Sequence, residues 1–169
     1  MSFPSINNTC KAIERLQHVA EHYKSEDKFI QACEVLLSMA QVCASKERYA
    51  EASDFFEKAA QLTFDCSENS RVRAPAYLLS AGLCLLVLGD ELAISDAFTR
   101  YKTMSNRVQE NANVQCLMTL TQHVRQGDLE AFDALLQSEE GIVGSDALHR
   151  TMTDKIRQSI VARQAKVES

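Results

Sequence analysis

The stretch LLSMAQVCASKERYAEASDFFEKAAQL, residues 36–62, decides the fold. Apolar and small residues recur three and four apart on both sides of the polar turn around Lys46, a period typical of amphipathic helices. Ala40 and Ala52 stand twelve positions apart, one in each expected helix. Because small side chains let two helix backbones approach closely, the stretch predicts a pair of antiparallel helices joined by a short turn.

The same spacing recurs along the chain, which indicates a repeat architecture. Ala81 and Ala93 are again twelve apart, and Thr119 with Ala131 makes a weaker third copy. The copies lie about forty residues apart, longer than the 34 of an ordinary tetratricopeptide repeat, which implies lengthened helices. The expected repeat positions are Leu36, Ala40, Cys43, Ala52, Phe56, Tyr77, Ala81, Cys84, Ala93 and Ala131. We expect an all-α, tetratricopeptide-like right-handed solenoid of antiparallel helix hairpins with a C-terminal helical cap, and residues 1–169 as a single helical-repeat domain.

The periodicity predicts about eight helices, over residues 6–23, 26–44, 48–64, 71–88, 91–104, 111–126, 129–137 and from 145 to a polar tail at 164–169. Ser25 is the expected N-cap of the second helix. The pairs Gly89–Asp90 and Gly127–Asp128 place a C-terminal glycine directly before a capping aspartate, which predicts two tight turns. Pro75 lies either in the first turn of its helix or at a kink, and the sequence leaves both open. A loop is expected at residues 141–144.

Composition narrows the class of protein. The formal net charge is −5 and the pI is about 5.4, so nucleic acid is not an expected partner, because that affinity comes mostly from Lys and Arg on phosphates. The six cysteines form no CxxC pair, and Cys33, Cys43 and Cys84 fall on apolar stripes, as packed thiols of a reducing compartment do. No secretory signal is apparent, and the longest apolar run, residues 76–89, is too short to span a bilayer. We expect a cytoplasmic protein.

His18 and His22 are the one pair with metal-ligand spacing, since residues four apart share a helix face. The metalloprotease form of this pair requires a glutamate directly after the first histidine, and Val19 stands there. A solvated helix face is therefore the favoured interpretation. We expect no catalytic residue, no metal and no cofactor.

Several basic residues gather around the fourth and fifth helices of this acidic chain: Arg71, Arg73, Arg100, Lys102 and Arg107. Two interpretations stay open, a plain solvated surface, which is commoner, and contact with an acidic partner. On the second, Arg71, Arg73, Lys102 and Arg107 are candidate partner-binding residues.

Four stretches carry a resemblance to a known family. They are AIERLQHVAEHYKSED (12–27), the opening stretch (36–62), AYLLSAGLCLLVLGDELAISDAFTRY (76–101) and LHRTMTDKIRQSI (148–160). In one collinear order, they make the chain resemble the soluble NSF attachment proteins, adaptors that link SNARE bundles to a disassembling ATPase. The resemblance covers most of the chain and corresponds to the C-terminal half or slightly more of a typical member.

The resemblance implies an adaptor whose inner face lies along a SNARE complex and whose C-terminal end docks onto the NSF-type ATPase, in the cytoplasm and peripheral to endomembranes. It implies that Lys24 and Arg71 keep a positive charge of the family's inner face, whereas Glu34, Pro75 and Val114 replace basic residues. The family's membrane-touching N-terminal loop has no counterpart, so we expect at most peripheral membrane contact. The alternative is a divergent helical-repeat scaffold that binds another helix or peptide without SNARE activity. A shortened solenoid is also expected to expose an apolar end and to self-associate there.

Overall fold

The computed structural model describes residues 3–144 and 146–168, with side chains from Asn8 onward. Every regular element in these ranges is helical. The α-helices are α1 (Phe3–Ser25), α2 (Phe29–Ser45), α3 (Tyr49–Cys66), α4 (Ala74–Leu88), α5 (Glu91–Met104), α6 (Ala112–Gln126), α7 (Leu129–Ser138) and α8 (Ala147–Glu168). Two 3-10 turns, η1 (Arg71–Arg73) and η2 (Val108–Glu110), and a π-helical turn, η3 (Glu140–Gly144), complete the described chain.

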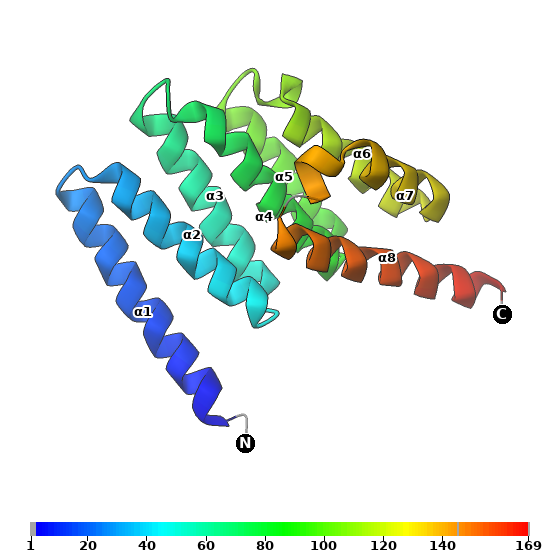
Figure 1. Ribbon diagram of the computed structural model, residues 1–169, viewed down its shortest axis with the longest axis horizontal. Coiled ribbons are helices and arrows are strands. Elements are labelled where there is room, and N and C mark those ends of the chain that lie inside the picture. Colours follow the sequence, from blue (N-terminus) through cyan, green and yellow to red (C-terminus); the bar gives the residue numbers. More distant parts are fainter. Residues whose placement is uncertain (1–2, 145, 169) are drawn as a thin grey trace.

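Consecutive helices run antiparallel and stack side by side in chain order (Figure 1). Helices α1 to α4 pack successively against one another, and α6 packs against α4 and α7. The last helix, α8, crosses this stack, packs on α4 and touches α2 and α7. The arrangement is solenoid-like, which confirms the predicted all-α repeat class.

Helix α4 lies at the centre of the molecule and is apolar all round. Every side chain from residue 78 to 86 is buried, because α3, α6 and α8 cover it from three sides. Of the described residues, Arg71–Leu88 is long and apolar enough to cross a membrane, but 61% of it is buried inside the fold, as expected of a core helix. At Gly82 an added Cβ would lie 2.2 Å from Leu117 Cδ2, so only glycine allows α6 to approach this closely.

The two turns predicted from glycine and aspartate are confirmed. Gly89 and Gly127 adopt left-handed backbone conformations, with φ of 69° and 66°, as glycine readily does. The carboxylate of Asp90 accepts a hydrogen bond from the Ala93 amide, and that of Asp128 accepts one from the Ala131 amide, each at 3.0 Å. These caps satisfy donors that the first helical turn leaves free.

The first two turns differ from the prediction. Ser25 is not the N-cap of α2, because α1 runs on to Ser25 and its hydroxyl donates to the His22 carbonyl at 2.6 Å. Lys28 precedes α2 without a side-chain cap. Asp27 and Glu47 stand in the left-handed region, with φ of 57° and 60°. These turns therefore take the left-handed conformation without glycine.

The remaining boundaries settle what the sequence left open. Pro75 lies in the first turn of α4, where the missing amide costs little, directly after the 3-10 turn η1. The expected loop at 141–144 is the π-helical turn η3. The polar tail expected at 164–169 is helical as far as Glu168, where α8 ends. Ser145, the expected start of this helix, lies outside the described residues.

Helix α8 docks on α4 through a buried polar contact and a sulfur pair. His149 Nε2 lies 2.7 Å from Ser80 Oγ, and both residues are buried. One turn further, Cys84 Sγ donates to Met152 Sδ at 3.6 Å. These contacts hold α8 across the middle and the C-terminal end of α4.

Helix α8 also reaches other elements through basic side chains. Lys155 forms an ion pair with Glu47 in the α2–α3 turn. Arg163 Nη1 donates to the Val124 carbonyl at 2.8 Å, at the C-terminus of α6, where a cation suits the negative end of the helix dipole. Residues 161–168 are exposed, so the end of α8 projects from the stack.

Candidate partner-binding surfaces

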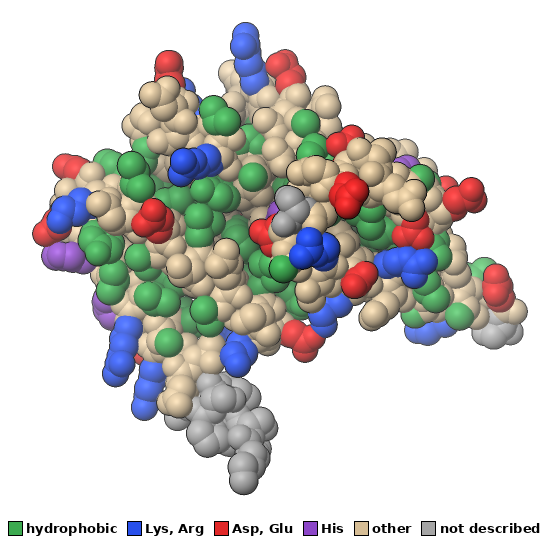
Figure 2. All heavy atoms as spheres, viewed as in Figure 1, with side chains coloured by type: hydrophobic (Ala, Val, Ile, Leu, Met, Phe, Trp, Pro, Cys, Tyr) green, Lys and Arg blue, Asp and Glu red, His purple; other side chains and the backbone are tan. Residues whose placement is uncertain are grey.

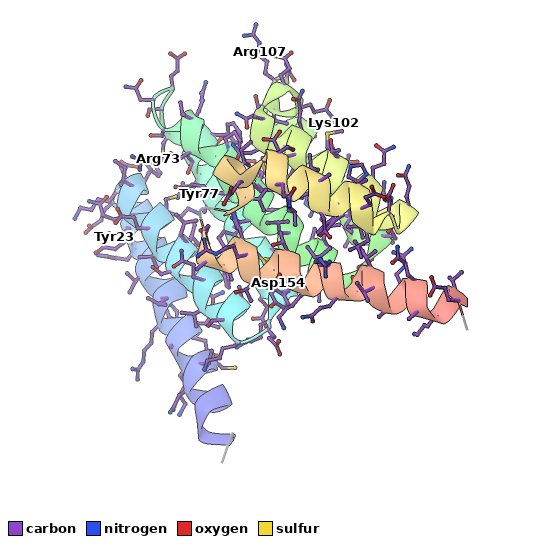
Figure 3. The ribbon with its side chains drawn as sticks, turned by 45° about the vertical axis from the view of Figure 1, so that its right-hand side comes forward. Tyr23, Arg73, Tyr77, Lys102, Arg107 and Asp154 are labelled. Atoms are coloured by element: carbon purple, nitrogen blue, oxygen red, sulfur yellow. The ribbon has the colours of Figure 1, made fainter. Side chains whose placement is uncertain are left out.

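The five cations proposed from sequence lie along one edge of the stack. Because α1, α3 and α5 are parallel, their C-terminal ends and the loops that follow meet at the same edge (Figure 1). These helix ends and the segments that follow them carry Lys24, Arg71, Arg73, Lys102 and Arg107. In Figure 3, Arg73 lies beside Tyr77 at the start of α4, whereas Lys102 and Arg107 lie further along the edge and Arg107 points away from the body. The five share an edge but do not form one cluster.

The five cations differ in the contacts that their side chains make within the protein. Lys24 lies 3.8 Å from Glu21, and Arg71 Nε donates to the Phe64 carbonyl at 2.9 Å. The side chains of Arg73, Lys102 and Arg107 make no hydrogen bond or salt bridge within the described part of the chain. Acidic side chains stand among them at Glu26, Asp27, Asp65, Glu68 and Glu110. The edge is therefore mixed in charge and is not a basic patch.

Arg100, counted in the basic group from sequence, has a structural contact. Its guanidinium binds the Glu57 carboxylate with two hydrogen bonds of 2.8 and 2.7 Å. This bidentate pair joins α3 to α5, and Glu57 is 9% exposed. Such pairs are geometrically specific, so Arg100 holds two helices together and is not a free cation.

An open groove lies between α2 and the start of α4, and sequence reasoning missed it. It has a volume of about 250 Å³ and a floor that includes Cys33, Leu37 and Tyr77. Glu34 on α2 and Arg73 at the end of η1 also line it. Figure 2 shows hydrophobic side chains gathered over this side of the molecule. Its walls are about forty residues apart in sequence, so no local pattern marks the groove.

A second groove, of about 570 Å³, opens between α1 and α3. Phe29, Leu36 and Phe55 form part of its apolar lining, and Lys58 stands 5.4 Å from the centre of the Phe55 ring. Among the described side chains of α1, the exposed ones are polar apart from Ala12 and Val19, and Val19 is 40% exposed. The described side chains of α1 thus offer little of the apolar end expected for self-association, which stays a prediction.

The histidines and cysteines of the described chain are not gathered into a metal-binding group. His18 and His22 are exposed on α1, and His22 Nε2 lies 3.3 Å from the Glu26 carboxylate. Within residues 3–144 and 146–168, no three histidine, cysteine or acidic side chains are grouped so that they could hold a metal ion. All six cysteines are free, and burial raises the pKa of Cys84 to about 12 and that of Cys116 to about 11. Thiols with such pKa values are protonated and unreactive at neutral pH.

A stack of antiparallel helix pairs with open grooves between helices defines the chain as a helical-repeat protein, a class that binds other macromolecules along extended surfaces. Residues 4–161 match the family described as soluble NSF attachment protein, SNAP. The chain therefore belongs to the soluble NSF attachment protein family, as the resemblance predicted.

Individual relatives are distant. The chain is 25% identical over 154 residues to the alpha-soluble NSF attachment protein of Vitis vinifera, which covers 91% of this chain and 53% of the relative. It is 27% identical over 150 residues to the beta-soluble NSF attachment protein of Bos taurus, which covers 89% and 50%. The chain thus spans about half the length of the curated relatives it matches. No solved structure matches it.

Proposed function

We propose that this chain is a non-enzymatic adaptor of the attachment-protein type, which binds SNARE complexes and recruits the NSF-type ATPase in vesicle-mediated intracellular protein transport. The observation that carries the proposal is the family match, which runs through residues 4–161 and so includes every helix of the stack. On this proposal the protein works in the cytoplasm, peripheral to endomembranes, and binds its partners along the stack.

The proposal assigns the edge cations a steering role. Arg73, Lys102 and Arg107 have no intramolecular ion pair among the described residues, so their charges are available to an acidic partner. Lys24 and Arg71 add two more charges along the same edge. Since the edge also carries acids, we expect these cations to raise the association rate more than the affinity.

The test is a pull-down in two stages with purified components. An assembled SNARE bundle is immobilised, the chain is bound, and the ATPase is then added. We expect retention of the chain by the bundle, and retention of the ATPase only when the chain is present. If the folded chain binds neither partner at about 0.05 M salt, where charge attraction is weakly screened, the proposal is wrong.

Charge reversal tests the edge. The double variant K102E/R107E is compared with K11E/R15E, which makes the same change of charge on exposed residues in the N-terminal half of α1. We expect only the first to slow association, and the difference to shrink at about 0.3 M salt. Equal association rates for both variants would remove these residues from the partner-binding surface.

The alternative function is a divergent scaffold that clasps another helix without SNARE activity. The observation that favours it is Glu34, an exposed acid on the α2 wall of the groove between α2 and the start of α4, where the family resemblance implies a base. This alternative predicts that the chain, shown by circular dichroism to be helical and folded, leaves the SNARE bundle unbound at every salt concentration.

A further inference from the structure

The groove between α2 and α4 is the open part of a longer valley. On α2 the residues Ile30, Leu37 and Ala44 stand seven apart, so they share one face of the helix. On α4 the residues Tyr77 and Cys84 share a face in the same way. At Ala44 and Cys84 this valley is closed by α8, whereas at Ile30 and Tyr77 nothing in the described chain covers it. The protein thus already places a helix over one part of this valley.

The open part is bordered by an apolar side chain that faces solvent. Ile30 on α2 lines the groove and is 65% exposed. Beside it the floor is formed by half-buried Phe29, Leu37 and Tyr77. Large exposed apolar residues around a hollow are typical of protein interaction sites, where one bulky side chain of the partner fills the pocket.

The two walls of this groove carry opposite charges. Arg73 stands on the α4 wall and Glu34 on the α2 wall. Neither side chain forms an ion pair within the described ranges. Because an acid and a base stand unpaired on opposite walls, the groove complements a partner with the reverse order of charges.

We propose that this groove anchors one helix of the partner bundle by a bulky apolar side chain, flanked by a carboxylate toward Arg73 and a basic residue toward Glu34. The occupant is a helix because α8 covers the same valley, and because helix-in-groove recognition uses such anchors a few residues apart. The inference rests on the proposed function and specifies its contact: apolar insertion holds the partner, and the paired charges set its direction.

The first experiment measures affinity for an immobilised, assembled SNARE bundle. Ile30→Asp changes an exposed side chain of the groove, so the variant is expected to fold. Leu92→Asp is the matched control, since Leu92 on α5 is 71% exposed and lies outside the groove. We expect I30D to raise Kd about tenfold or more, as for interface anchors, and the control to leave it unchanged. Equal affinities for wild type and I30D would overturn the anchor.

The second experiment reverses the polarity and keeps the net charge. The double variant E34K/R73E exchanges the charges of the groove walls, and E91R/R125E exchanges an exposed ion pair between α5 and α6 as a control. We expect weaker binding from the first variant alone. Unchanged binding by E34K/R73E would overturn the assigned direction. If wild type itself does not bind the bundle, the proposed function falls and the anchor with it; if wild type binds and the groove variants bind equally well, the anchor alone falls.

Discussion

The two halves of the molecule build the same helical hairpins from different residues. All five glycines lie after residue 81, and the first 81 residues contain none. The α1–α2 and α2–α3 turns place Asp27 and Glu47 in the left-handed conformation that Gly89 and Gly127 occupy later. The closing hydrogen bond is the same, from Lys28 N to the Tyr23 carbonyl at 2.8 Å and from Asp128 N to the His123 carbonyl at 3.1 Å.

This difference shows which turns are determined by the residues of the turn itself. In the second half the α4–α5 and α6–α7 turns each contain a glycine for the left-handed residue and an aspartate for the cap. In the first half α2 and α3 begin after Lys28 and Arg48 without a side-chain cap. We infer that packing between helices, and not turn chemistry, sets these two turns.

Gly82→Ala is expected to have the largest effect, because it breaks the glycine-dependent contact that the first half lacks. The new Cβ would stand 2.2 Å from Leu117 Cδ2, and this crowding outweighs the better helix propensity of alanine. We expect a net loss of about 1–3 kcal/mol in the free energy of unfolding, measured by urea denaturation.

A double-mutant cycle provides the control for Gly82. Leu117→Ala removes the atoms that the added Cβ would meet, so G82A should cost little in that background. The same cost in both backgrounds would show that crowding against Leu117 is not the reason for glycine here.

Gly89→Ala is expected to have the next largest effect on stability, and it tests the backbone conformation of the turn alone. An added Cβ meets nothing within 4 Å, so only the left-handed φ of 69° is strained. We expect a loss of about 1 kcal/mol, which corresponds to a Tm lower by about 2–4 °C. Gly127→Ala, with φ of 66° and an equally open site, should match it. A loss at one turn and none at the other would contradict this account.

How far the sequence predicts this protein depends on whether the determining residues are neighbours in the chain. The helix class and the glycine–aspartate turns are predicted, since each is a local pattern. The Ser25 cap is wrong because a serine near a helix end suits either end, and packing of α1 decided between them. The candidate groove could not be predicted, because its walls at Ile30 and Tyr77 meet only after α2, α3 and α4 have stacked.

A smaller effect concerns pH and the docking of α8 on α4, where His149 lies beside Ser80. Burial lowers the pKa of His149 from its ordinary value of 6.5, and the Asp146 carboxylate opposes this. The unfolded chain therefore binds the proton at higher pH than the folded chain. Stability from this site is complete above pH 6.5 and decreases as the pH falls through the lowered pKa.

His149→Gln removes this titration and keeps a polar side chain beside Ser80. We expect urea midpoints of the variant to fall less than those of wild type between about pH 7.5 and about pH 5. His18→Gln, on the exposed face of α1, is the control and should follow wild type. Parallel pH curves for wild type and H149Q would remove His149 as a source of acid sensitivity.

Asp27→Gly is expected to have the smallest effect and the opposite sign, because it gives a turn of the first half the residue that the second half uses. Asp27 is exposed, and its φ of 57° is a conformation that glycine adopts without strain. Asp tolerates this conformation better than most residues, and glycine is freer in the unfolded chain, so the gain is about 0.5 kcal/mol. Glu47 is a poorer site for this test, because its carboxylate pairs with Lys155 and the variant would also lose that contact.

A Tm raised by about 1–2 °C in D27G, beside the loss in G89A, would show that the same geometry carries strain in one half only. A lower Tm would mean that the Asp27 side chain stabilises its turn by more than its backbone conformation costs.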